Sequence, residues 1–158
     1  MPHRVVEEVG DGAHELDRVA RHHQGADVLL GHLQGEGVGR LQTVGRQPLF
    51  DPLPGTGRWE TVLLADGNVG LGGDPWRVLR RAAELISETG RCVVEFEAAG
   101  AGVRSSWVRL ESSDNIGPWF RWASVGIDYA ASLAREVGLA VIGIHPIGDR
   151  VVATLAPE

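Results

Sequence analysis

The residues best placed to do chemistry follow a run of apolar side chains. Residues 61–66 read as a strand covered on both faces; the run ends in Asp66, and Gly67 and Asn68 follow it. Side chains at the carboxyl end of such a strand face the crevice in which open α/β sheets bind ligands. These three residues therefore predict a ligand-binding loop, and the alternative is a polar turn that only precedes a helix.

A second set of candidates lies in an aromatic-rich stretch after residue 102. Its aromatic faces and guanidinium could hold a planar or anionic ligand. The residues are Trp107, Trp119, Phe120, Arg121 and Trp122. Polar and apolar residues alternate on both sides of a turn at residues 112–115, which predicts a β-hairpin. Packing of this hairpin against a sheet is therefore the alternative role of the same side chains.

A helix and a strand are expected directly after the loop. Asp74 is placed to cap a helix that Gly90 ends, and a strand follows at residues 92–97. Glu95 and Glu97 alternate with apolar neighbours in that strand. Buried carboxylates need partners or access to the crevice, so one of the two is expected to face it.

The end of the sequence predicts a helix and two strands. Asp128 is placed to cap the helix and Gly138 to end it. Residues 139–145 and 150–155 then read as strands joined by a connection short enough for antiparallel pairing. His145 could act as a base, but a lone histidine at a strand end is more often structural, so no catalytic residue is assigned.

Composition changes sharply near residue 47. All the Trp, Phe and Tyr residues come after it, whereas five of the six His and all the Gln precede Pro48. A segment without aromatic side chains lacks the largest side chains from which a hydrophobic core is built. We therefore expect residues 1–46 to be poorly structured or translated in a shifted frame, and residues 47–158 to form the domain. Translating the encoding DNA upstream of Pro48 in the other two frames tests the shifted frame.

Bulk properties argue against several classes of function. The 158 residues suit one domain, and their net charge of −6 without a basic stripe argues against nucleic-acid binding. Cys92 is the only cysteine, which excludes an internal disulfide and a multi-thiolate zinc site; the histidines lack metal-ligand spacing. The sequence shows neither a signal-peptide core nor an apolar run of membrane-spanning length, so we expect a cytoplasmic protein without a metal or a membrane partner.

Taken together, the later elements resemble the C-terminal half of S-adenosylmethionine-dependent methyltransferases of the Rossmann-like class. The resemblance covers about residues 47–157 and rests on the stretches PLFDPLPGTGRW, ETVLLADGNVGLGGDPW and GLAVIGIHPIGDRVVATL. They are similar to that family's connector into its fourth strand, to its acid-Gly-Asn loop with the next helix start, and to its closing strands. The implied fold class is α/β: a truncated Rossmann-like methyltransferase sheet, mostly parallel with an antiparallel C-terminal strand pair, and an irregular N-terminal third.

The resemblance also implies a function. S-adenosylmethionine would be the cofactor, and its methyl group would pass to an O, N or C nucleophile of a small-molecule acceptor. Asp66, Gly67 and Asn68 would lie beside the methionine part of the cofactor, and Phe50 and Asp51 near its adenine. The acceptor pocket would contain Trp107, Trp119 and Arg121.

The family's glycine-rich cofactor turn is not recognisable before residue 47. Residues 35–39 mimic it, but too few residues separate them from the strand at 61–66 for the elements that should intervene. We therefore expect weak or no binding of the methyl donor. There are two alternatives. The first is a non-catalytic interaction module, which could form a homodimer through an exposed sheet edge. The second is a nicotinamide-dependent oxidoreductase, whose sheet has a similar arrangement of strands.

Overall fold

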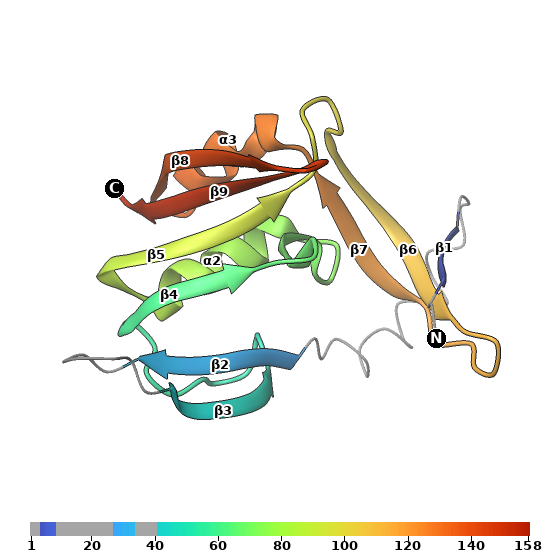
Figure 1. The fold of residues 1–158 in the computed structure, drawn as a ribbon, viewed down its shortest axis with the longest axis horizontal. Coiled ribbons are helices and arrows are strands. Elements are labelled where there is room, and N and C mark those ends of the chain that lie inside the picture. The colour runs from blue at the N-terminus through green and yellow to red at the C-terminus, as the bar shows by residue number, and fades with distance from the viewer. Residues whose placement is uncertain (1–3, 9–26, 34–40) are drawn as a thin grey trace.

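A four-stranded sheet forms the centre of the structure, a computed structural model that describes the backbone of residues 4–8, 27–33 and 41–158 and the side chains from residue 47 onward. The strand order is β4-β5-β9-β8 (Figure 1). β4 runs parallel to β5, and β9 is antiparallel to both β5 and β8. The bounds are β4 (Trp59–Leu64), β5 (Ile86–Phe96), β8 (Leu139–Ile147) and β9 (Arg150–Pro157).

Two helices cover one face of this sheet. In Figure 1, α2 (Pro75–Leu85) lies behind β4 and β5, and α3 (Ala130–Glu136) lies behind β8 and β9. The helices pack on two rows of buried side chains that cross the sheet in register, and these rows form the core of the described part. The rows are Val62, Cys92 and Leu155, and Leu64, Val94 and Ala153.

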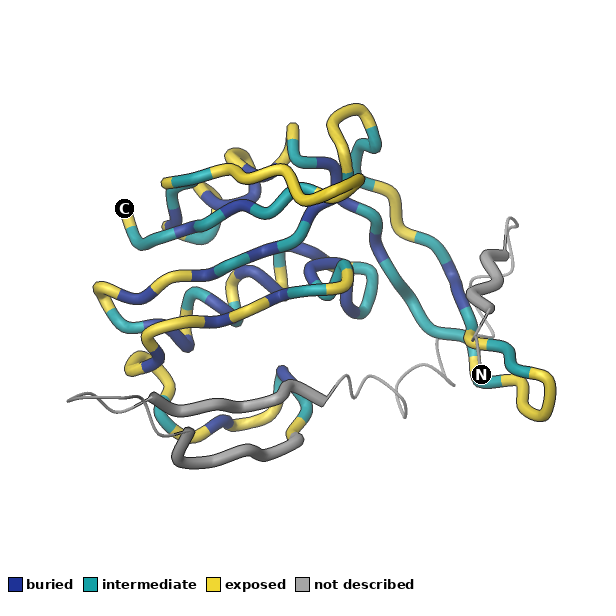
Figure 2. The backbone as a smooth tube through the Cα atoms, in the orientation of Figure 1, coloured by how far each residue is buried: buried dark blue, intermediate teal, exposed yellow. Residues whose placement is uncertain are grey.

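The other face of the sheet has no helix over it within the described residues. The alternate positions of the strands point to this side, among them Leu63, Val93 and Thr154, which form one row in register. Figure 2 shows buried and more exposed positions alternating along β4. Leu63 is 63% exposed, although it lies between two buried neighbours of the same strand.

A second sheet extends from the carboxyl ends of β4 and β5. It is an antiparallel hairpin, to which an N-terminal strand adds on one side in the order β1-β6-β7. A separate two-stranded sheet, β2-β3, precedes β4 in the chain, and two short 3-10 helices, η1 and η2, lie in the connections. Their bounds are β1 (Arg4–Glu8), β2 (Asp27–Leu33), β3 (Leu41–Pro48), η1 (Asn68–Gly70), β6 (Val103–Glu111), β7 (Phe120–Val125) and η2 (Ile127–Tyr129).

The expected antiparallel pairing of the last two strands is present, because a two-residue turn, Gly148 and Asp149, folds β9 back between β8 and β5. β4, β5 and β8 run in the same direction and only β9 runs against them, although β4 and β5 are the only described strands that pair in parallel. One feature of the expected fold is wrong for the described residues. The N-terminal third is not irregular throughout, since the backbones of β1, β2 and β3 form strands. β1 pairs with β6, which is some hundred residues away, and composition carries no signal for such a long-range pairing.

The bounds of the two helices also differ from expectation. α2 starts as expected, with the Asp74 carboxylate accepting the Arg77 backbone N–H at 3.0 Å, but it ends at Leu85. Gly90 instead lies within β5, where the backbone of Trp59 leaves no room for a side chain: a Cβ at Gly90 would lie 2.6 Å from the Trp59 carbonyl oxygen. Asp128 does not cap α3, because η2 already has turn geometry and leads directly into that helix.

The order strand, helix, strand, hairpin, helix, strand, strand is confirmed from β4 to β9. Gly138 follows α3 in a left-handed conformation, as expected of a residue that ends a helix. The division at residue 46 and the shifted reading frame stay predictions. No helix in the described ranges has both the length and the apolar character needed to cross a membrane.

Candidate functional site

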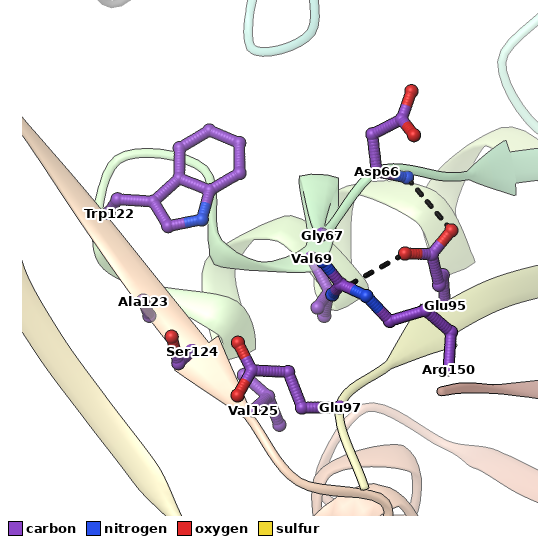
Figure 3. A pocket seen from close by; sticks show the side chains of 10 residues that line it. All are labelled: Asp66, Gly67, Val69, Glu95, Glu97, Trp122, Ala123, Ser124, Val125 and Arg150. Carbon is purple, nitrogen blue, oxygen red and sulfur yellow. Dashed lines mark hydrogen bonds and ion pairs between the residues drawn. The ribbon is translucent and has the colours of Figure 1, made fainter. Parts of the chain in front are cut away.

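A cavity of about 90 Å³ lies at the carboxyl ends of β4 and β5, where β7 closes one side (Figure 3). The loop after β4, the end of β5, the strand β7 and the first residue of β9 build its walls. The lining residues are Asp66, Gly67, Val69, Glu95, Glu97, Trp122, Ala123, Ser124, Val125 and Arg150. Two strands that run side by side in the same direction therefore deliver polar side chains to one crevice.

Asp66 has an unusual backbone conformation. Its φ of 54° is left-handed, and no other non-glycine residue in the described part of the chain has a positive φ. A side chain makes this conformation cost about 1–2 kcal/mol, so surrounding contacts must impose it. The Asp66 backbone N–H donates to Glu95 Oε2 at 3.1 Å, and Gly67 continues the left-handed turn at a φ of 69°. The chain thus turns sharply where β4 meets the cavity.

Glu95 links this turn to the far side of the crevice. While its Oε2 accepts from Asp66, its Oε1 lies 3.6 Å from Arg150 Nη1. The Glu95 side chain is 19% exposed and that of Arg150 46%, so the ion pair contributes more to positioning than to stability. Glu95 therefore has a structural partner on each oxygen.

Glu97 differs from Glu95. Its backbone N–H donates to the Val125 carbonyl at 2.9 Å, and its carbonyl accepts from the Ile127 N–H at 3.0 Å. These bonds fix the main chain beside β7, and Figure 3 shows the carboxylate directed toward Ser124. Within residues 47–158, no group donates a hydrogen bond to this carboxylate or forms an ion pair with it. The backbone of Glu97 is therefore fixed, and its carboxylate oxygens can still accept hydrogen bonds.

The glycines after β4 dock the hairpin on the sheet. A Cβ at Gly70 would lie 1.8 Å from the Ala123 carbonyl oxygen, so η1 and β7 touch backbone to backbone. The Ser105 hydroxyl donates to the Gly73 carbonyl at 3.1 Å, and Arg121 Nη2 donates to that hydroxyl at 2.8 Å. This joint holds β7, and with it the Trp122 indole, as a fixed wall of the cavity.

A wider groove of about 340 Å³ adjoins the cavity. Glu97 and Arg150 line both spaces, and Asp149 and three alanines complete the groove. A small molecule too large for the cavity alone could therefore extend past Glu97 into the groove.

The residues expected at the cofactor are only partly brought together. Asp66 and Gly67 line the cavity, whereas Asn68 begins η1 and is not part of the lining. Phe50 and Asp51 contact α2: the Arg77 guanidinium lies 3.9 Å from the Phe50 ring centroid, and Arg81 Nη2 donates to the Asp51 carbonyl at 2.8 Å. Neither residue lines the cavity.

The residues expected at the acceptor pocket lie on the hairpin, outside the cavity lining. Trp107 is buried, with the Arg121 guanidinium 5.6 Å from its ring centroid, and Arg109 lies 4.6 Å from the ring centroid of Trp119. These arginine–aromatic contacts stabilise the hairpin. The role of these side chains in acceptor binding stays a prediction.

Of the aromatic candidates, Trp122 lines the cavity, and only the pairing of β6 with β7 and the docking of Gly70 decide which indole does so. The sequence did not single out another lining residue, Arg150. Arg150 follows the last turn and reaches the crevice because β9 lies next to β5. Both Glu95 and Glu97 line the cavity, although the sequence predicted only one of them there.

No group of three or more His, Cys, Asp or Glu side chains in the described ranges is arranged to hold a metal ion. The lining of the cavity supplies carboxylates, one guanidinium, one hydroxyl and one indole.

Comparison with known proteins gives a result at the level of the fold. No protein-family model and no curated protein matches the chain. Among solved structures, the chain is similar to a SAM-dependent methyltransferase from Bacteroides fragilis in complex with S-adenosyl-L-homocysteine, at 18% identity and a TM-score of 0.55 over 70% of this chain and 52% of that one. It is also similar to the 1,6-didemethyltoxoflavin-N1-methyltransferase of Burkholderia thailandensis, with bound 1,6-didemethyltoxoflavin and S-adenosylhomocysteine, at 14% identity and a TM-score of 0.50 over 70% and 48%.

At these identities the likeness establishes the fold alone, and the chain spans about half the length of each of these enzymes. The resemblance inferred from the sequence is confirmed at this level, since the chain has a Rossmann-like methyltransferase fold.

Proposed function

We propose that this chain carries the acceptor side of an S-adenosylmethionine-dependent methyltransferase site for small molecules. The observation that supports the proposal is the cavity at the carboxyl ends of the parallel strands β4 and β5, with the strained Asp66 at its edge. The two enzymes of similar fold carry bound S-adenosylhomocysteine, and one of them also carries its small-molecule substrate. The reaction would transfer a methyl group to an O, N or C nucleophile.

The residues of the loop after β4 would serve the methyl donor. S-adenosylmethionine carries an ammonium group in its methionine part, and the Asp66 carboxylate would accept a hydrogen bond from it. Gly67, with no side chain, leaves room for close approach of a ligand to the backbone. The walls formed by Trp122 and Glu97 would orient the acceptor, since such enzymes act mainly by alignment of the reacting groups.

The described residues fit only one end of the donor. β4 is the outermost strand of its sheet in the described part, and no described strand hydrogen-bonds to its outer edge, beside which the adenosine group would have to be enclosed. The glycine-rich segment at residues 35–39 lies outside the described residues. We therefore propose that methyl transfer by this chain is impaired, and we derive no catalytic step through the donor.

Nuclear magnetic resonance titration with S-adenosylmethionine tests this function. We expect only weak binding, with a dissociation constant of about 1 mM or above, which corresponds to about −4 kcal/mol or less favourable. The affected backbone amides should be those of Asp66 and Gly67. Asp66→Asn should weaken these shifts without unfolding the chain, because Asn tolerates the left-handed conformation.

Asp114→Asn is the matched control, because Asp114 is exposed in the hairpin turn and outside the cavity lining. Shifts confined to other parts of the molecule would contradict the methyltransferase site. Micromolar affinity would contradict the impairment, because it would require a complete donor pocket.

A non-catalytic dimerisation module is the second candidate. It is favoured by the outer edge of β4, to which no other described strand hydrogen-bonds, and by the exposed Leu63 beside that edge. Open strand edges pair readily with another chain. Sedimentation at increasing protein concentration should then show a dimer that Leu63→Lys weakens and Ile116→Lys does not.

Ile116 is a suitable control because it is 64% exposed, almost the same as Leu63, but lies in the connection between β6 and β7. A monomer at every concentration would contradict this candidate. The cytoplasmic location expected from the sequence stays a proposal.

A further inference from the structure

The turn that follows β4 is shaped by its own residues. Asp66 and Gly67 both have a positive φ, of 54° and 69°. The Asn68 N–H donates to the Ala65 carbonyl at 3.0 Å and closes the turn. Two left-handed central residues inside such a bond are the pattern of a type I′ turn, for which Asp-Gly is a preferred pair. The local bond fixes the shape of the turn, but it does not fix how the turn is oriented relative to the sheet.

A hydrogen bond from β5 supplies that orientation. The bond that closes the turn does not use the N–H of Asp66, which donates to Glu95 Oε2 at 3.1 Å instead. Leu64 pairs with Val94, so Glu95 lies one position beyond the last paired residue of β5, beside the start of the turn. A side chain at this position ties the turn to the neighbouring strand.

Glu95 is itself held at its other oxygen. Arg150 Nη1, at the start of β9, lies 3.6 Å from Glu95 Oε1. Because β9 pairs with β5, the contacts run from the turn through β5 to β9, as the two dashed lines in Figure 3 show. A carboxylate that is restrained at both oxygens can hold a turn in place rather than follow its movement.

The direction of the Asp66 carboxylate follows from these restraints. With the peptide before Asp66 held by Glu95, the φ of Asp66 sets the direction of its Cα–Cβ bond. Figure 3 shows the Asp66 side chain directed away from the Glu95 carboxylate, although both residues line the cavity. The two like charges are thereby kept apart, and the Asp66 carboxylate oxygens do not compete for the donors that hold Glu95.

We infer that Glu95 is a positioning residue, which orients the turn by accepting the Asp66 N–H and so directs the Asp66 carboxylate. The inference rests on the proposed function for its meaning, because Asp66 is the residue that would serve the methyl donor. Glu95 acts through Asp66, and its hydrogen bond is present without any ligand.

Amide hydrogen exchange of the ¹⁵N-labelled chain tests this bond. Glu95→Ala removes the acceptor, and Glu95→Asp keeps the charge but shortens the side chain. Both should make the Asp66 amide exchange at least about tenfold faster, as expected when a hydrogen bond to a charged group is lost. Glu95→Gln keeps an acceptor oxygen at the same reach and should restore most of the protection. The indole N–H resonance of Trp122 should shift in the first two variants, because a Cβ at Gly67 would lie only 3.7 Å from that ring.

Two controls separate positioning from a general loss of structure. The Asn68 amide has its acceptor inside the turn, so its exchange should stay the same in every variant. Glu97→Ala removes a carboxylate from the same strand and the same cavity, and it should leave the exchange of Asp66 unchanged. Unchanged exchange of Asp66 in Glu95→Ala would mean that the turn holds itself. Equal acceleration at Asn68, or by Glu97→Ala or Glu95→Gln, would mean unfolding of the turn or an effect of charge, and each of these results would overturn the positioning role.

Addition of S-adenosylmethionine to the same variants separates this inference from the proposed function. Glu95→Ala should reduce the shifts of the Asp66 and Gly67 amides as far as Asp66→Asn does, and Glu95→Gln should largely keep them. If the unmodified chain shows no shifts at these amides, the proposed function fails, while the exchange rates still decide whether Glu95 holds the turn. If Glu95→Ala accelerates exchange but leaves the shifts intact, Asp66 meets the donor without this support, and the positioning role is overturned.

Discussion

The two faces of the main sheet differ in what lies on them. On the face that α2 and α3 cover, Val62 and Leu64 are 6% and 4% exposed, whereas Leu63 between them is 63% exposed on the other face. An antiparallel sheet with one solvated face usually alternates apolar and polar residues. β4 instead has aliphatic residues on both sides. Its sequence is therefore typical of a strand covered on both faces, although the described structure covers one.

The residues that stabilise the fold and those that line the crevice lie in different parts of the molecule. The covered face holds the core, and the crevice lies at the carboxyl edge of the sheet, reached from β4, β5 and β7. The part of this chain that matches a methyltransferase of similar fold covers about half of that enzyme. Under the proposed function, a donor pocket would need further structure at the open face and at the outer edge of β4, to which no described strand hydrogen-bonds.

The largest effect is expected on the covered face. Leu79 of α2 is fully buried against the sheet, so Leu79→Ala should lower the free energy of unfolding by about 2–5 kcal/mol. Urea denaturation followed by circular dichroism measures this loss. A cost below about 1 kcal/mol would mean that the covered face is loosely packed, and the contrast between the faces would disappear.

The next effect tests whether the hairpin belongs to the same folding unit as the covered face. Gly70→Ala places a methyl group against the backbone of β7 and should cost about 1–3 kcal/mol or more, because neither backbone can move independently. Both circular dichroism and the Trp122 resonance should report the change. If only the resonance changes, the hairpin opens separately from the sheet.

Gly72→Ala is the matched control for this joint. Gly72 has a positive φ, of 67°, which Gly70 does not have, but nothing lies within 4 Å of a Cβ placed at Gly72. This variant should therefore show only the backbone strain of about 1–2 kcal/mol. The Trp122 resonance should change in Gly70→Ala only, and an equal change of that resonance in both variants would contradict the close contact between η1 and β7.

A third prediction concerns the thiol in the middle of the covered face. Burial raises the pKa of Cys92 from 9.0 to about 12, because the thiolate would lose its hydration. Between these values the unfolded chain releases a proton that the folded chain keeps. Stability should therefore be unaffected by this group below pH 9 and fall above it, by up to about 1.4 kcal/mol per pH unit.

Urea denaturation at pH 8 and pH 10 measures this fall, and Cys92→Ala, which lacks the thiol, should show a smaller one. In parallel, Ellman's reagent should react with the native chain at pH 8 only on unfolding. Rapid reaction of the folded chain would show that the covered face opens locally, and the two faces would then differ less than their burial suggests.

The sequence predicted those parts of the fold that local patterns determine. The apolar run before Asp66, the Asp74 cap and the alternation in the hairpin each report a period or a capping chemistry, and the elements they predict are present. The pairing of β1 with β6 and the position of β9 between β5 and β8 depend on contacts distant in the sequence, which no local pattern carries.

The candidate site was predictable to the same extent. Asp66 and Gly67 follow a strand, so their place at the crevice could be read from the sequence. Trp122 is one of three tryptophans in the hairpin region, and only the close contact at Gly70 selects it for the cavity wall. A glycine in a predicted ligand-binding loop can thus instead be the point where two backbones pack against each other.

The smallest effect is expected on the open face, and it sharpens the comparison most directly. Leu63→Ala removes the same atoms as Leu79→Ala, but the Leu63 side chain is mostly in water in the described structure. A surface substitution of this kind should change the free energy of unfolding by no more than about 0.5 kcal/mol in dilute solution. The two leucine variants, measured in the same urea titration, therefore give the difference between the faces as one number. If Leu63→Ala costs as much as Leu79→Ala at low protein concentration, this face is covered within a single chain. A cost that appears only as the concentration rises would instead place a second copy on it, since association stabilises the folded state by mass action.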